Sequence, residues 1–316
     1  MTPLFLLSSL LLNKGTAFSN EFFDFRPISP TLDAEQRELV IDRALFEEKL
    51  MGRNGSPLEE ETGEEGGTST LLLQKEGLVR KNSVMSSLTA NNLLLAVKEK
   101  LARERNGSGG SDVFANVLLG ENTLGESKRF DLLLDFDDEI VLRATQEVLD
   151  VGGIGRILVD LFGLSAELYE LSTMISLPGS ARQTIHPDTP WQNGGLMTCF
   201  IALQDVGEEM GPTVFFPKTH CEESHSIIHD RIRRDDWINK TEHKTCLLSK
   251  GDSLIFDSRT LHAGTSNRSD GKDRVLFYFS FRDVNLRRPS YLTNNTGSLK
   301  SKLKGRRYNI GEIMSL

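Results

Sequence analysis

The sequence predicts an α+β protein in which several helices precede a mainly β core. Two observations lead to this prediction. Apolar residues recur at helical spacing in the first half of the chain, whereas the part after Gly163 consists of short β-branched and aromatic segments separated by Gly, Pro and Asp turns. Many short strands with regular turn signals favour a sandwich or barrel. A chain of 316 residues is long enough to bury a substantial core.

The chain opens with an apolar run over residues 1–12 that is too short to span a bilayer. This run is similar to the apolar region of a cleavable signal, so residues 1–19 are expected to be a secretory or plastid targeting segment. The alternative is a buried N-terminal helix in a cytoplasmic protein. Helical spacing predicts a helical segment over 20–51, and the Gly- and Glu-rich stretch 52–70 predicts a disordered acidic linker.

A helical region with a Gly/Ser-rich break is expected over 71–127, and its clearest helix covers 91–105. Two more helices are predicted over 137–150 and 154–163. Six strands follow, at 171–177, 195–206, 213–216, 245–248, 253–256 and 274–281. Residues 286–316 are predicted to be a basic C-terminal tail, either solvated or attractive to an anionic substrate such as an acyl-CoA.

The composition excludes several classes of protein. Lys and Arg number 37 against 45 Asp and Glu, so the net charge of −8 argues against a nucleic-acid partner. Three cysteines without a C-x-x-C motif argue against a disulfide framework or a zinc ribbon. All six histidines lie after residue 185, so any histidine-containing site is expected in the C-terminal half.

The segment Gln183-Thr-Ile-His186-Pro-Asp188 suggests a metal site. Residues i and i+2 of a strand point to the same face, so His186 and Asp188 could bind one ion together. His262 is the best candidate for a third ligand. Two histidines and one carboxylate leave open positions on the metal, which is typical of non-haem Fe(II) oxygenases.

Arg274 is the candidate for binding a keto-acid co-substrate such as 2-oxoglutarate. It opens the predicted strand 274–281, where it shares one face with Leu276, Tyr278 and Ser280. A buried guanidinium needs an anionic partner, and it fits a carboxylate in two parallel hydrogen bonds. The rival cations Arg268 and Lys272 lie in a turn-like segment, where solvation is expected.

Taken together, these segments resemble the phytanoyl-CoA dioxygenase family of Fe(II)/2-oxoglutarate oxygenases. The resemblance covers residues 159–282. It includes the Q-x-x-H-x-D pattern at 183–188, the block Gly211-Pro-Thr213 to Pro217-Lys-Thr-His220, and the terminal region from His262 through Asn267-Arg-Ser269 to Arg274. Lys218-Thr219 stands where the family usually has Gly-Ser.

The resemblance implies an oxygenase domain over 128–285, built as a double-stranded β-helix (a cupin-like jelly roll) with the N-terminal helices packed on it. It also implies Fe(II), 2-oxoglutarate and O₂ as cofactor and co-substrates. The implied iron ligands are His186, Asp188 and His262, and the implied 2-oxoglutarate contacts are Arg274 and Thr213 of the Gly-Pro-Thr element. Gln183 and Trp191 are expected either to line the pocket or to be ordinary packing residues.

The expected reaction is hydroxylation of an unactivated C–H in a small-molecule or lipid-derived substrate, with decarboxylation of 2-oxoglutarate to succinate and CO₂. Asp188 supports hydroxylation, since related halogenases have a small residue at that position. One alternative is a prolyl-4-hydroxylase-like oxygenase acting on a protein or peptide, although that group generally uses Lys where this chain has Arg274. The other is a non-catalytic cupin-like binding protein. The oligomeric state stays open.

Overall fold

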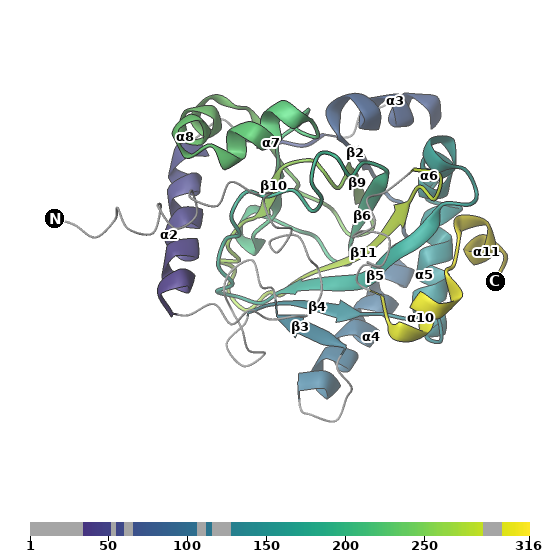
Figure 1. Cartoon of the computed structure of the whole chain (residues 1–316). Helices are drawn as coiled ribbons and strands as arrows, with labels where there is room; N and C mark the ends of the chain where they lie inside the picture. The colour runs from purple at the N-terminus through teal and green to yellow at the C-terminus, as the bar shows by residue number, and fades with distance from the viewer. Residues whose placement is uncertain (1–33, 52–54, 60–65, 106–111, 116–127, 287–298) are drawn as a thin grey trace.

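The computed structural model describes residues 34–51, 55–59, 66–105, 112–115, 128–286 and 299–316 (Figure 1). It shows a mixed α/β fold in which two β-sheets form the centre and helices cover their outer sides. The targeting segment predicted for residues 1–19 lies outside the described residues.

The larger sheet has seven strands, and each adjacent pair is antiparallel. In spatial order they are β2 (Leu78–Lys81), β9 (Ser253–Asp257), β6 (Leu196–Ala202), β11 (Arg274–Arg282), β5 (Glu167–Ser176), β4 (Arg129–Leu133) and β3 (Val113–Ala115). The smaller sheet has the order β1 (Gly55–Pro57), β8 (His243–Thr245), β7 (Thr213–Phe215) and β10 (His262–Gly264). Only the β1–β8 pair among these described strands is parallel.

Strand β11 shows how the sequence builds the centre of the larger sheet. Every residue of this strand is buried, so both of its faces are covered. Val275, Phe277, Phe279 and Phe281 point to one face and join the main hydrophobic core. Arg274, Leu276, Tyr278 and Ser280 alternate with them and share the other face, as their spacing predicted. On that face Leu276 and Tyr278 pack in a cluster with Phe215 of the smaller sheet. One face of this strand therefore provides packing and the other provides polar groups.

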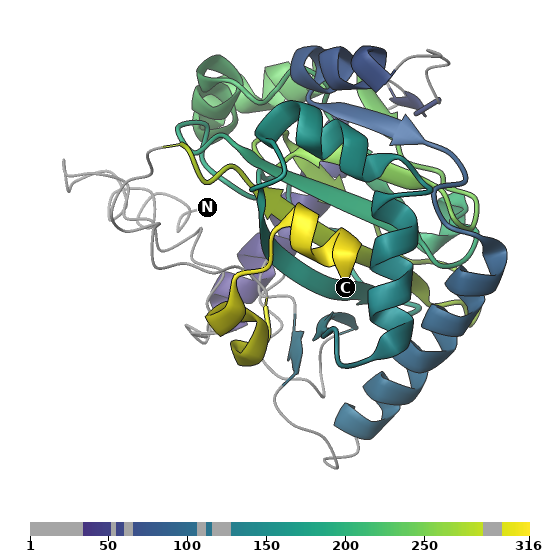
Figure 2. The same ribbon diagram turned by 90° about the vertical axis from the view of Figure 1, so that its right-hand side faces the viewer.

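Helices cover the core face of the larger sheet: α3 (Gly66–Glu76), α4 (Ser87–Arg105), α5 (Glu139–Leu149) and α6 (Ile154–Phe162). The short C-terminal helices α10 (Ser301–Arg306) and α11 (Ile310–Ser315) add to this layer (yellow in Figure 2). Ile310 and Ile313 are completely buried in the same core. The predicted basic tail therefore contains a packed segment, because its apolar residues are held against the helices.

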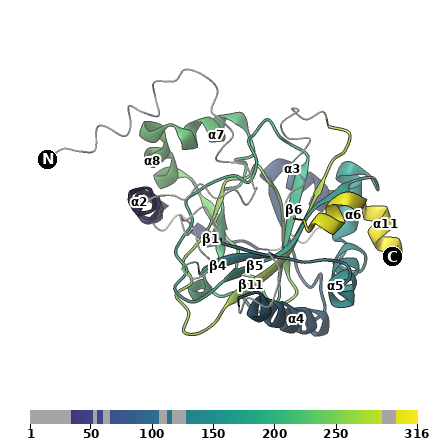
Figure 3. The ribbon, with the colours of Figure 1, turned by 60° about the horizontal axis from the view of Figure 1, so that its bottom comes forward.

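The remaining helices lie on the side of the smaller sheet. Helix α2 (Ala34–Met51) contacts α8 (Arg231–Lys240), which follows α7 (Glu222–His229), and Figure 3 shows these three opposite α5 and α6. A short 3-10 helix, η3 (Glu208–Met210), precedes β7. Within the described part of the chain, no helix is both long enough and apolar enough to cross a membrane.

Several predicted element boundaries differ from the structure. The expected order of helices first and strands afterwards is wrong, because β2, β3 and β4 come early in the chain yet join the larger sheet. Helices α7 and α8 also interrupt the expected β unit. Within the predicted linker 52–70, residues 55–57 pair with β8 and residues 66–70 begin α3, while the remaining linker residues except 58–59 lie outside the described ranges.

Candidate functional site

His186 and His262 are brought together by the backbone. They form an isolated antiparallel bridge in which each N–H donates to the other residue's carbonyl at 2.9 Å. His262 is the first residue of β10, whereas His186 belongs to no named strand. The predicted strand through His186 and Asp188 is therefore reduced to a single bridge. Asp188 is instead held by its own N–H, which donates to the carbonyl of Ser258 at 2.8 Å.

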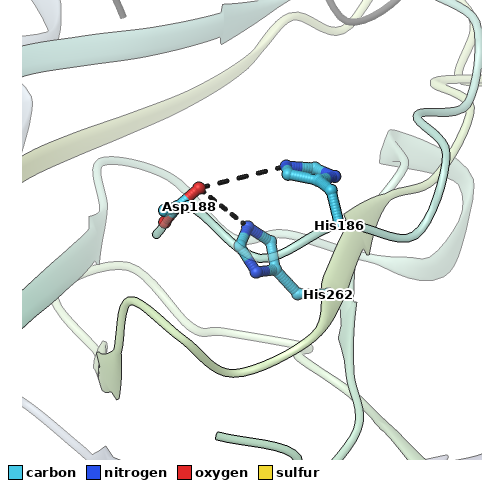
Figure 4. A group of neighbouring side chains, drawn as sticks. All are labelled: His186, Asp188 and His262. Carbon is cyan, nitrogen blue, oxygen red and sulfur yellow. Dashed lines mark ion pairs between the residues drawn. The ribbon is translucent and has the colours of Figure 1, made fainter. Parts of the chain in front are cut away.

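The three predicted ligands lie around one point in space. Asp188 Oδ1 is 3.5 Å from His262 Nε2 and 3.9 Å from His186 Nε2 (Figure 4). One ligand atom from each residue lies within 4.8 Å of the other two, which suits a single metal ion. The donor set of two imidazole nitrogens and one carboxylate oxygen is the facial triad of non-haem iron enzymes.

Both rings are oriented to bind a metal through Nε2. His186 Nδ1 lies 2.7 Å from the carbonyl of Thr184, and His262 Nδ1 lies 2.9 Å from the carbonyl of Thr260. A carbonyl oxygen only accepts hydrogen bonds, so each Nδ1 carries a proton, and in the neutral form of each ring Nε2 has the lone pair that a metal needs. The residues present therefore fit an iron ion in both donor type and tautomer.

The protonation states of His186 and Asp188 suit metal binding, whereas the contact with Asp188 raises the pKa of His262 despite its burial. Burial, together with the neighbouring His262, lowers the pKa of His186 to about 4, so this ring is neutral at pH 7. Burial alone would raise the pKa of Asp188, but His262 and His186 reverse that effect and the pKa is lowered overall. A neutral imidazole and an ionised carboxylate are the forms that ligate metals.

His186, Asp188 and His262 line a cavity. Six side chains of the larger sheet line it: Asp131, Glu170, Met174, Thr198, Phe200 and Tyr278. Gln183 and Thr213 line the cavity from the opposite side, whereas Trp191 is not among its lining residues. The side-chain oxygen of Gln183 accepts the N–H of Gly264 at 2.9 Å, and Gly264 pairs with Thr213.

Arg274, the first residue of β11, is completely buried. Its guanidinium donates to the carbonyl of Gly211 and, at 3.1 Å, to Ser176 Oγ, which are both neutral oxygens. Its Nε has no hydrogen-bond partner among the described residues. Burial and the nearby Arg129 lower the pKa of Arg274. A buried cation with neutral partners is costly, so the site is suited to an anionic ligand. The rivals Arg268 and Lys272 are exposed.

Arg129 is a candidate residue that the sequence reasoning missed. It lies in β4 directly opposite Ser176, which is itself opposite Arg274 in β11. Arg129 is completely buried and donates through Nη2 to the carbonyls of Ala181 and Thr265, at 3.0 and 3.1 Å. Arg129 and Asp131 alternate with apolar neighbours in the sequence, and this alternation could have predicted the strand.

Asp131 and Tyr278 form a buried pair in the cavity wall. The Tyr278 hydroxyl donates to Asp131 Oδ1 at 3.0 Å. Burial raises the pKa of Asp131 to about 6, although Tyr278 and Arg129 oppose the effect. Burial, with the nearby carboxylates Asp131 and Glu170, raises the pKa of Tyr278. The cavity wall therefore contains hydrogen-bonded polar groups as well as Met174 and Phe200.

Comparison with solved structures shows a common fold. SnoK, a non-haem α-ketoglutarate-dependent carbocyclase from nogalamycin biosynthesis, aligns with a TM-score of 0.54 and 17% identity over 79% of this chain and 97% of its own. The epimerase SnoN from the same biosynthesis aligns with a TM-score of 0.51 and 16% identity over 69% and 82%, respectively. AviO1 from Streptomyces viridochromogenes Tue57 aligns with a TM-score of 0.54 and 13% identity over 72% and 99%.

No curated protein sequence matches this chain significantly. The phytanoyl-CoA dioxygenase (PhyH) family model matches residues 136–275, a range that contains the three predicted metal ligands and Arg274. The range also contains β5 through β10 and therefore most of the two sheets around the cavity. Residues 136–275 of this chain are thus similar to the phytanoyl-CoA dioxygenase family.

Proposed function

We propose that the protein is an Fe(II)- and 2-oxoglutarate-dependent dioxygenase that hydroxylates an unactivated C–H of a small-molecule or lipid-derived substrate. 2-Oxoglutarate is decarboxylated to succinate and CO₂ in the same reaction. The observation that carries this proposal is the arrangement of His186, Asp188 and His262, with both Nε2 atoms directed at one carboxylate oxygen beside a cavity.

We infer that the two sheets form a double-stranded β-helix. Successive segments alternate between the sheets: β5 and β6 belong to the larger sheet, and the His186 bridge between them pairs with the smaller one. After β7 and β8 in the smaller sheet, the chain returns to the larger sheet at β9, to the smaller at β10 and to the larger at β11. This alternation supports a cupin-like jelly roll with its site between the sheets.

The residues that would hold iron are His186 and His262 through Nε2 and Asp188 through Oδ1. When bound, Fe(II) supplies the activation of O₂ and the oxidation of the substrate C–H. The protein orients the ligands, because the carbonyls of Thr184 and Thr260 fix both rings. Such partners of the ligating rings contribute to metal affinity.

Arg274 is the residue that would bind the far carboxylate of 2-oxoglutarate. Its guanidinium is buried and contacts Ser176 Oγ and, at 3.9 Å, the sulfur of Met174, which lines the cavity. A carboxylate placed there would replace neutral partners by a charge-assisted pair. Thr213 and Gln183, on the opposite wall, are further candidate contacts for the co-substrate.

The presence of Asp188 supports hydroxylation over halogenation, since the carboxylate occupies a ligand position that a halide would need. Arg274 likewise argues against the prolyl-4-hydroxylase-like alternative, which generally uses Lys. The predicted targeting role of residues 1–19 remains part of the proposal, and sequencing the N-terminus of the mature protein tests it.

The test is to load the purified protein with Fe(II), add 2-oxoglutarate under air and measure succinate. We expect slow succinate release without a primary substrate, and we expect His186→Ala to abolish both iron binding and succinate release. A wild-type protein that neither binds iron nor releases succinate would favour the non-catalytic cupin-like alternative and would overturn the proposal.

A further inference from the structure

The face of the larger sheet that borders the cavity has two arginines at one end and the carboxyl group of Glu170 toward the other. At one end, Arg129 and Arg274 lie on either side of Ser176 on neighbouring strands. Toward the other end, Ser280 of β11 lies directly opposite Glu170 of β5 and Thr198 of β6. Arg274 and Ser280 are six residues apart on one strand, which corresponds to about 20 Å at roughly 3.3 Å per residue.

The row at the Glu170 end is joined by hydrogen bonds. Ser280 Oγ donates to Glu170 Oε2, and it lies 2.9 Å from Thr198 Oγ1. Thr198 Oγ1 is in turn 3.1 Å from Ser258 Oγ. All four side chains of this row are buried, with Glu170 the most accessible at 8% exposure. A buried carboxylate is therefore held in a defined position in the cavity wall.

The predicted metal ligands lie between the two ends of this face. The segment that carries His186 and Asp188 begins with Gln183 near the Arg129 end. The side-chain oxygen of Gln183 accepts the N–H of Gly264, and Gly264 lies close to Arg129. The ligand segment ends at Asp188 on the other side, where the Asp188 N–H donates to the carbonyl of Ser258, the last residue of the row that begins at Glu170. An anionic co-substrate bound at Arg274 would thus occupy one side of the ligands and leave the Glu170 side for the primary substrate.

We propose that Glu170, with Thr198 and Ser280, forms the subsite that recognises an N–H or O–H donor of the primary substrate, an ammonium or a hydroxyl group. The carboxyl oxygens of Glu170 can accept hydrogen bonds from a donor in addition to Ser280, and in the ionised form this group repels another carboxylate or a phosphate. The subsite therefore selects against a free fatty acid or an acyl group whose anionic end would lie here. This inference rests on the proposed function, because it requires 2-oxoglutarate to occupy the Arg274 side.

The experiment uses three probes of equal chain length: hexylamine, hexan-1-ol and hexanoate. Binding is measured by calorimetry to the full chain with Fe(II) and saturating 2-oxoglutarate in the absence of O₂, so that hexanoate cannot bind at Arg274. The variant is Glu170→Gln, which keeps an acceptor for Ser280 and removes the charge. The matched control is Glu167→Gln on the same strand, since Glu167 pairs with Arg282 at 2.9 Å and does not line the cavity.

We expect the wild type and Glu167→Gln to bind the amine or the alcohol about tenfold more tightly than hexanoate, and Glu170→Gln to lose that preference. Tighter binding of the amine than of the alcohol would assign an ammonium, and the reverse would assign a hydroxyl. The inference is overturned if hexanoate binds best, if Glu170→Gln keeps the preference, or if the wild type binds none of the probes. A preceding titration with Fe(II) and 2-oxoglutarate separates these results from failure of the proposed function, which would abolish that first binding step.

Discussion

Glu47 accepts a hydrogen bond at 2.7 Å from the backbone N–H of Ile185, the residue immediately before His186. Glu47 belongs to helix α2, upstream of the region that matches the family model. Its side chain is completely buried, and its second oxygen pairs with Arg43 Nε at 2.8 Å. The nearby Arg182 is also buried, and its pKa is lowered by burial despite the opposing charge of Glu47. Helix α2 therefore supports the segment that presents His186.

Replacing Glu47 should disturb both stability and metal binding. Glu47→Ala leaves the buried N–H of Ile185 without its acceptor, which should cost about 1–3 kcal/mol of unfolding free energy. Glu47→Gln keeps an acceptor and should cost less. Denaturant unfolding measures the stability, and equilibrium dialysis measures the Fe(II) affinity. Equal Fe(II) affinities in the alanine and glutamine variants would show that Glu47 does not position His186.

The metal ligands can be tested against a histidine outside the site. His186→Ala and His262→Ala should each remove bound iron, because only two protein ligands would remain. His220→Ala is the matched control, since His220 Nε2 lies 3.0 Å from the carbonyl of Gln74 and the residue does not line the cavity. Metal analysis by plasma emission after desalting provides the measurement. Retention of iron by both ligand variants would exclude this triad.

Arg274→Ala should weaken 2-oxoglutarate binding while leaving iron binding intact. Loss of a buried charge-assisted carboxylate contact costs roughly 3 kcal/mol, so the apparent KM for 2-oxoglutarate should rise about 100-fold. Arg274→Lys keeps the charge without the planar fork and should give an intermediate KM. Succinate release as a function of 2-oxoglutarate concentration provides the KM. Loss of iron from the alanine variant would instead assign Arg274 to the metal site.

Asp131 should make the stability of the metal-free protein depend on pH. Burial raises its pKa to about 6 from an ordinary value of 3.8, so the folded chain keeps a proton that the unfolded chain releases. The unfolding free energy should therefore fall by about 3 kcal/mol as the pH rises from about 4 to about 6, and this contribution should then stay constant. Asp131→Asn keeps an acceptor for Tyr278 and removes the titration. Unfolding curves at several pH values compare the two proteins, and an unchanged pH dependence in the variant would contradict the assignment.

Much of the central structure could be predicted from local patterns. β-Branched and aromatic runs predicted strands that correspond to β5, β6, β7, β8, β9 and β11, although β8 begins and ends earlier than expected. Strand β11 was the clearest case, because Phe277 and Phe279 alternate with Leu276 and Tyr278 as its two covered faces require. The helices at α4, α5 and α6 followed from their apolar spacing in the same way.

The elements that were missed depend on distant partners. Strand β4 has two charged residues, Arg129 and Asp131, on a buried face. This pattern is not typical of a core strand, and the strand is recognised only from its pairing with β5. Strand β2 has only four residues and is stabilised by its pairing with β9. The hydrogen bond of Glu47 could not be predicted from local sequence either, since its partner Ile185 lies far along the chain. Such contacts arise from register and packing, which local propensity does not contain.

The sequence by itself determined the chemistry that the site can carry: His186, Asp188 and His262 as a metal-binding donor set, and Arg274 as a strand-borne cation. Residue types and short spacings are local properties, so they are visible without a fold. Only the tertiary structure decided that both Nδ1 atoms are occupied by carbonyls, that Arg129 accompanies Arg274, and that Glu170 lies toward the opposite end of the same sheet face. These relationships depend on the pairing of strands distant in sequence, which sets the neighbours, the burial and the electrostatic environment of each side chain.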